Sequence, residues 1–178
     1  MCKEKEFVFQ GLHVIAWIIF VGLCIEASAL IVNFVVSLYK PEILENLYQK
    51  LDISDIYSRN KYAFYGMYSF VLVIAILKAY LFYIVISLMH KLDMAKPFND
   101  YVAKQVSKIS YNTFSIGLIS YIAHQSTNRL EDHGYDINKL SEFWADSQAF
   151  ILMSAVIYII AYIFTKGVEL QNENDLTV

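Results

Sequence analysis

Two charged side chains lie inside otherwise apolar stretches of the sequence, and their types suggest chemistry. Glu26 lies near the middle of the apolar stretch 7–38, and Lys78 lies near the middle of the stretch 62–89. A single unpaired charge at the centre of a bilayer costs about 2.5–3.5 kcal/mol on insertion scales, and pairing lowers that cost. Neighbouring antiparallel helices would place the two residues at similar depth, so we expect an ion pair inside the membrane.

This ion pair has two interpretations. As a structural feature, it would fix the register of two helices against each other. As a functional site, it would move a proton or an ion or bind a ligand, because ionisable groups inside a membrane are functional candidates by default. The sequence leaves both interpretations open.

No other residue pattern points to catalysis. The histidines are His13, His90, His124 and His133. They lack close metal-ligand spacing, such as two histidines four positions apart on one helix. The two cysteines, Cys2 in the N-terminal tail and Cys24 inside an apolar stretch, suggest neither a disulfide nor a metal cluster. The sequence contains no phosphate-binding loop, dinucleotide fingerprint or serine elbow. We therefore expect a protein that is not an enzyme and that needs no cofactor.

The elements that must position the two charges are long apolar stretches. Four of them run over about 7–38, 62–89, 101–123 and 148–165. Each is about as long as the roughly 20-residue helix that crosses a bilayer. Hydrophobic residues make up 57% and charged residues 17% of the 178 residues, as expected for several spans. The predicted fold class is all-α: an integral membrane four-helix bundle that forms a single membrane domain over 1–178.

The third stretch is the least apolar of the four. It contains Asn112, Thr113, Ser115 and Gly117. Small and hydroxylated residues of this kind usually mark a helix face that packs against other helices.

The loops that follow the first and the third apolar stretch both show helical periodicity. Residues 41–51 place Leu44, Leu47, Tyr48 and Leu51 on one helical face, and residues 138–149 place Leu140, Phe143 and Trp144 similarly. We expect a short amphipathic helix in each loop, which extends a span or lies on the membrane surface. The alternative is a lid that binds a partner.

Charge suggests the orientation of the chain. The short connection 90–108 carries Lys91, Lys96, Lys104 and Lys108, whereas the loop 125–147 is acidic, with Glu131, Asp132, Asp136, Glu142 and Asp146. Lysine-rich short connections usually stay in the cytoplasm, so we place both termini there. The formal net charge of −3 argues against direct binding of nucleic acid.

Two stretches carry a family resemblance. The inner turn reads Lys96-Pro97-Phe98, and the tail 167–178 follows a Gly-x-x-Leu-Gln-x-Glu-x-Asp-Leu-Thr-Val pattern. Four spans with this turn and this tail resemble the bacterial membrane family labelled domain of unknown function 2975. The family usually has a glycine close before Pro-Phe, where this chain has Ala95 and Lys96.

The resemblance implies a multi-pass protein of the bacterial inner membrane. Members of the family are often encoded beside a small helix-turn-helix regulator, which implies a regulatory or sensory role through contact with a cytoplasmic transcription regulator. The residues expected to bind this partner belong to the tail: Gly167, Glu169, Leu170, Glu173, Asp175 and Leu176. Gly167 is also a plausible helix end, and the tail would otherwise fold back on the lysines of 90–108.

Two other functions remain open. The first is a small channel or transporter, which would be a homo-oligomer because four helices rarely enclose a water-filled path alone. The second and weaker alternative is a membrane enzyme. Membrane lipid is an expected partner in every case.

Overall fold

The computed structural model describes residues 2–39, 54–92, 97–135, 137, 140, 142–144 and 146–176. The elements in chain order are α1 (Cys2–Tyr39), α3 (Ser54–Arg59), α4 (Lys61–Lys91), α5 (Asp100–Asp132), the 3₁₀-helix η2 (Glu142–Trp144) and α7 (Ser147–Leu176). All regular structure in the described residues is helical, which confirms the all-α prediction there. Three of these helices, α1, α4 and α7, are long and apolar enough to cross a membrane.

Helices α4 and α5 begin where the sequence indicates, each after an asparagine that caps the helix. The side chain of Asn60 accepts a hydrogen bond from the backbone nitrogen of Tyr62 at 3.0 Å. The side chain of Asn99 accepts one from the backbone nitrogen of Val102 at 2.9 Å. Both asparagines satisfy backbone donors that have no partner within the helix.

The end of α7 differs from the prediction. Gly167 does not end the helix, which continues to Leu176. Among the described glycines only Gly134 has the positive φ that typically ends a helix, so Gly167 stays helical. Lys166 and Glu169, one turn apart, form an ion pair that supports the helix at this point.

The structure describes only part of the two loops in which the sequence predicts short amphipathic helices. Residues 41–51 lie outside the described residues. Within 138–149 the structure contains η2 and the beginning of α7. Helix α3, which the sequence reasoning missed, precedes α4.

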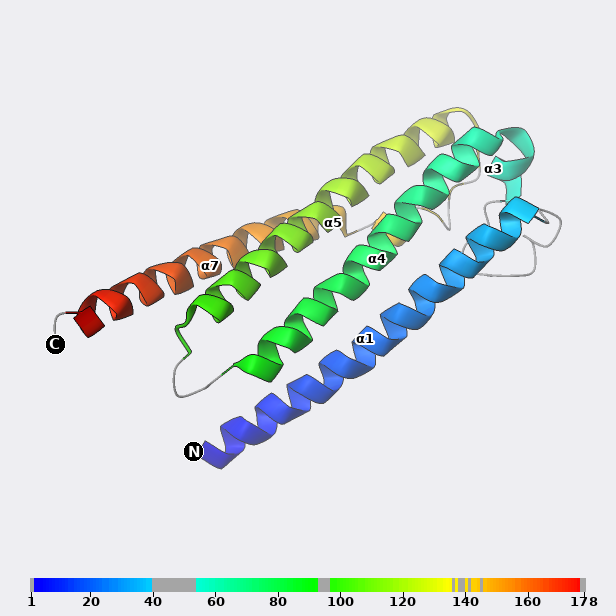
Figure 1. Ribbon diagram of the computed structural model, residues 1–178. Helices are drawn as coiled ribbons and strands as arrows, with labels where there is room; N and C mark the ends of the chain where they lie inside the picture. Colours follow the sequence, from blue (N-terminus) through cyan, green and yellow to red (C-terminus); the bar gives the residue numbers. More distant parts are fainter. Residues whose placement is uncertain are drawn as a thin grey trace.

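Each long helix packs mainly on its neighbour in the chain. Helix α1 packs on α4, α4 on α5, and α5 on α7. Figure 1 shows the long helices α1, α4, α5 and α7 side by side, with both termini toward the same end of the molecule. A hydrogen bond from a side chain to a backbone carbonyl joins each pair: Tyr68 to Leu30 at 2.9 Å, Asn112 to Leu77 at 2.9 Å, and Ser110 to Ser154 at 3.0 Å. These bonds use the second lone pair of helix carbonyls.

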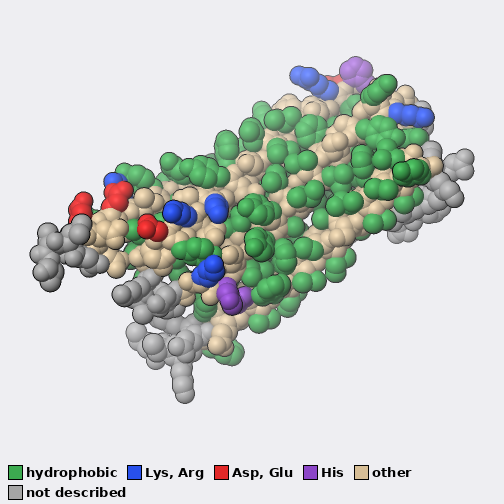
Figure 2. Space-filling model, viewed as in Figure 1, with side chains coloured by type: hydrophobic (Ala, Val, Ile, Leu, Met, Phe, Trp, Pro, Cys, Tyr) green, Lys and Arg blue, Asp and Glu red, His purple; other side chains and the backbone are tan. Residues whose placement is uncertain are grey.

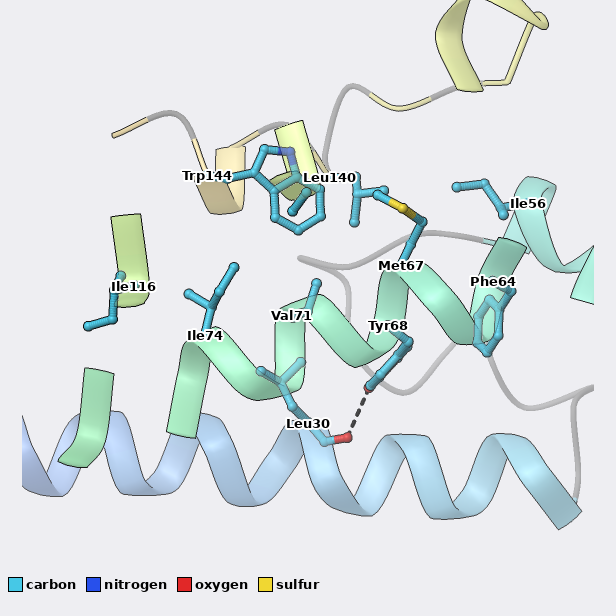
Figure 3. Close-up of a cluster of buried hydrophobic side chains, with 11 residues drawn as sticks. Leu30, Ile56, Phe64, Met67, Tyr68, Val71, Ile74, Ile116, Leu140 and Trp144 are labelled. Atoms are coloured by element: carbon cyan, nitrogen blue, oxygen red, sulfur yellow. Dashed lines mark hydrogen bonds between the residues drawn. The ribbon is translucent and has the colours of Figure 1, made fainter. Parts of the chain in front are cut away.

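The main buried cluster surrounds the half of α4 nearer to Lys61. Figure 3 shows Leu30 of α1 below α4, and Leu140 and Trp144 above it. Tyr68 and Val71 of α4 lie between these layers and are 2% and 1% exposed. Leu140 and Trp144, from the chain between α5 and α7, therefore belong to the core.

The face of the molecule in Figure 2 is apolar between two charged ends. Figure 2 shows hydrophobic side chains over most of the visible face, with the charged side chains gathered toward its two ends. Such a band is typical of helices that stand in a bilayer.

Candidate functional site

Helix α7 begins about halfway along α5. Gly117, near the middle of α5, lies against Ile151 in the second turn of α7, where a Cβ on Gly117 would meet Ile151 Cγ1 at 2.7 Å. From there α7 runs antiparallel to α5 and past its first residue, because Gly167 contacts Phe98, which precedes α5. Helix α7 therefore covers only the half of α5 nearer to Asp100.

Two described residues of the chain between α5 and α7 pack on α4. Leu140 and Trp144 are each 1% exposed and belong to the same buried cluster as Val71 and Ile74 of α4. Non-helical backbone at membrane depth is tolerated where protein covers it. Ile137, Leu140 and Trp144 of this connection are buried and meet that condition, whereas Asp146 is exposed.

Glu26 and Lys78 come together at one small cavity. The cavity has a volume of about 30 Å³ and is lined also by Leu23 of α1, by Val71, Ile74 and Ala75 of α4, and by Phe143 of η2. Within the described side chains, no ion pair of 4.0 Å or less joins Glu26 to Lys78. A cavity of this size holds about one water molecule. The structure thus brings the two charges together without a direct contact.

Lys78 also faces the beginning of α7. Its ammonium lies 5.8 Å from the centroid of the Phe150 ring, within the range of a cation–π interaction. Next to Lys78, the carbonyl of Leu77 accepts the hydrogen bond from Asn112. We refer to Glu26, Lys78, Asn112 and Asp146 as the central polar layer, because the first three lie in the middle parts of α1, α4 and α5 and Asp146 precedes α7, which begins about halfway along α5.

A groove between α4 and α7, with α5 as its floor, lies beside this layer. It has a volume of about 420 Å³ and is here called the α4–α7 groove. Its lining residues are Leu81, Phe82 and Val85 of α4, Ile109 and Thr113 of α5, and Asp146, Ala149, Phe150, Met153 and Ile157 at the start of α7. The hydroxyl of Thr113 donates to the carbonyl of Ile109 at 2.7 Å. Asp146 is the one charged side chain in this lining.

The inner turn and the tail, which carry the family resemblance, contact each other. A Cβ on Gly167 would lie 2.8 Å from Cδ1 of Phe98, so the absence of a side chain at Gly167 lets the Phe98 ring approach α7. The ring centroids of Phe98 and Phe164 are 5.1 Å apart. Pro97 lies directly before this contact, and Lys96 lies outside the described residues.

As far as Leu176, the tail is an extension of α7. Glu169 pairs with Lys166 of the same helix, and Leu170 is 60% exposed. Glu173 is exposed as well. The backbones of Asp175 and Leu176 belong to α7, and their side chains lie outside the described residues. The tail thus presents a helical surface, which the sequence reasoning did not foresee.

Two histidines meet near the end that carries both termini. The rings of His13 on α1 and His90 on α4 have centroids 6.4 Å apart. The indole nitrogen of Trp17 donates to Nε2 of His13 at 3.1 Å. Sequence spacing gave no sign of this contact, because the two histidines lie on different helices.

Asp146 is the site residue that sequence reasoning missed. The sequence places it in an acidic loop together with Asp132 and Glu142. The structure places it at the α4–α7 groove, because α7 begins so far along α5. The only signal in the sequence is its position directly before the last apolar stretch.

These features define a multi-pass helical membrane protein, with three helices long and apolar enough to cross a bilayer. The chain belongs to the family described as protein of unknown function DUF2975, whose sequence model matches residues 48–178. This match confirms the resemblance and leaves α1 outside the matched region. No curated protein matches the chain, and no solved structure matches it.

Proposed function

We propose that the protein is a regulatory or sensory protein of the bacterial inner membrane that acts on a cytoplasmic helix-turn-helix transcription regulator and is not an enzyme. The observation that carries the proposal is the course of α7. Its first turns line the α4–α7 groove through Phe150 and Met153, and its last turns form the tail. Because one continuous helix connects the two regions, a change at the groove that moves α7 also moves the tail.

The proposed membrane domain is a four-span bundle in which α5 is the third span. Helix α5 is more polar than its neighbours, but its polar residues lie on its packed face: Ser110, Asn112, Thr113, Ser120 and Thr127 are buried. The exposed residues between Lys108 and Gln125 are Tyr111, Phe114, Leu118, Tyr121 and Ile122. This stretch of helix is about 26 Å long, close to the roughly 30 Å of a hydrocarbon core.

The orientation that we propose places both termini in the cytoplasm. The contacts of His13 with His90 and of Phe98 with Gly167 support one shared end for the N-terminal part of α1, the connection between α4 and α5, and the tail. The exposed lysines near this end are Lys91, Lys104, Lys108 and Lys166. Basic residues close to span ends favour the cytoplasmic side.

The tail is the proposed contact surface for the regulator. Leu170 and Glu173 are exposed on a helix that continues beyond the contact with Phe98. An apolar side chain beside carboxylates suits a partner with a basic surface, because complementary charge guides association and a desolvated apolar side chain adds affinity.

The proposal is tested by removing residues 169–178 and co-purifying the regulator from membranes in mild detergent. This truncation keeps Gly167 and Val168, so the packing on Phe98 stays intact. We expect the truncated protein to remain folded and to lose the regulator. The matched control is Glu131→Gln with Asp132→Asn, which removes acidic charge at the opposite end and leaves binding unchanged. Full retention of the regulator by the truncated protein would refute the proposal.

A homo-oligomeric channel or transporter is the second candidate, because the central polar layer places Glu26 and Lys78 about halfway along their helices. Such a pore needs several copies with Glu26 or the acidic loop lining a lumen. The molecular mass of the detergent-solubilised protein tests it: a monomer excludes this function. A membrane enzyme is the weakest candidate.

A further inference from the structure

The α4–α7 groove ends at a carboxylate that no described side chain neutralises. Asp146 is exposed at the groove, and no ion pair joins it to any described cationic side chain. The described side chains of the central polar layer include two carboxylates, Glu26 and Asp146, and one ammonium, Lys78. Lys78 lines a cavity with Glu26 and makes no ion pair with Asp146, so Asp146 has no cationic partner among the described side chains.

The rest of the groove suits an apolar molecule. Its volume of about 420 Å³ falls within the range of roughly 300–1,000 Å³ that is typical of small-molecule sites. Aliphatic side chains form most of its walls, and Phe82 and Phe150 add aromatic rings. Aromatic faces attract cations when water is excluded. The Phe150 ring already has the ammonium of Lys78 at 5.8 Å from its centroid, so Phe82 is the ring that favours the same sign of ligand charge as the carboxylate.

We propose that the α4–α7 groove binds a lipophilic cation, with its apolar body between α4 and α7 and its single positive charge beside Asp146. A neutral acyl chain would fill the walls but would leave Asp146 without a partner, so it would gain nothing from the carboxylate. A lipophilic anion would be repelled by Asp146. Such binding goes beyond the proposed regulatory role and does not require it.

The test measures saturable binding of tetraphenylphosphonium to the full-length protein in mild detergent by equilibrium dialysis. Tetraphenylborate, which has a similar shape and the opposite charge, is the matched probe. We expect the cation to bind at one saturable site, and the anion neither to bind there nor to compete. Asp146→Asn should weaken binding by roughly tenfold or more, because it removes one partner of a desolvated charge pair.

Three further variants separate charge from shape and from folding. Asp146→Glu keeps the charge and should retain binding. Met153→Trp adds bulk to the groove about two helical turns from the carboxylate and should abolish binding. Glu131→Gln removes an exposed carboxylate of α5 far from the groove and should change nothing. Thermal melting of each variant identifies those that fold.

Several results would overturn the proposal. These are an absence of saturable binding to the wild-type protein, equal binding of tetraphenylborate, or undiminished binding by folded Asp146→Asn. Undiminished binding by Met153→Trp would place the cation outside the groove and would equally refute the assignment. If Asp146→Asn does not fold, Asp146→Glu and Met153→Trp decide: the proposal requires binding by the first and loss of binding by the second.

Discussion

Replacing Gly117 with alanine tests the closest approach between α5 and α7. A Cβ at this position would lie 2.7 Å from Cγ1 of Ile151 and 2.9 Å from its backbone nitrogen. The Cγ1 atom can rotate away, but the backbone nitrogen cannot. Restoring an ordinary contact of about 3.5 Å therefore requires α7 to move outward by roughly 0.6 Å, the difference between that distance and the 2.9 Å approach.

The cost of this movement can be isolated with a matched glycine. Overpacking costs about 1–3 kcal/mol, and it is partly offset because alanine favours a helix by about 1 kcal/mol over glycine. Gly66 of α4 is helical and exposed, and a Cβ added there would have no atom within 4 Å. Gly66→Ala thus gains the same helix propensity without a clash. The two variants should differ by about 1–3 kcal/mol, or roughly 2–12 °C in melting temperature.

The assay is thermal melting of the detergent-solubilised full-length protein, followed by size exclusion. Gly117→Ala should melt below Gly66→Ala. The outward shift should also stretch the bond from Ser110 to Ser154, which is 3.0 Å long. Ser110→Ala should therefore cost less in the Gly117→Ala background than in the wild type, because neighbouring changes are not additive. Equal melting of the two glycine variants would refute this helix contact.

Three other predictions concern the central polar layer and the proposed third span. Asn112→Leu loses the hydrogen bond to the Leu77 carbonyl, and it should destabilise the protein by about 1 kcal/mol in the same melting assay. Lys78→Met alone should lower the melting temperature more than Glu26→Gln plus Lys78→Met, and equal or additive losses would contradict pairing of the two charges. Phe114→Cys, on the exposed face of α5, should resist a membrane-impermeant maleimide in intact vesicles, and labelling there would argue against α5 as a span.

Helices α1 and α4 could be predicted from composition because apolar side chains surround them. Helix α1 is apolar on all sides rather than on one face, and its large apolar residues, such as Ile18 and Ile25, are exposed. For such helices length and hydropathy suffice. The positions of Glu26 and Lys78 within their stretches also predicted that the two residues would come near each other, because antiparallel packing of α1 on α4 preserves depth.

The stretch 148–165 predicted where α7 begins in the chain, but the point along α5 at which α7 begins could not be predicted in the same way. Its place along α5 depends on tertiary contacts, above all Gly117 with Ile151 and Trp144 with the buried cluster around α4. The residues of α4 that cover Trp144 are about 70 positions away in the chain, so local periodicity carries no trace of them. The sequence therefore places Asp146 in the acidic loop, whereas the structure places it at the groove.

The polar face of α5 has a consequence for how the chain enters a membrane. Asn112 and Ser110 find their hydrogen-bond acceptors on α4 and α7, and α7 is the last of these helices to leave the ribosome. On the four-span topology, a newly made α5 would expose this polar face to lipid until α7 arrives. We therefore expect the insertion machinery to release α5 and α7 into the membrane together. In a nascent chain that stops before Ser147, α5 is complete but should be poorly integrated.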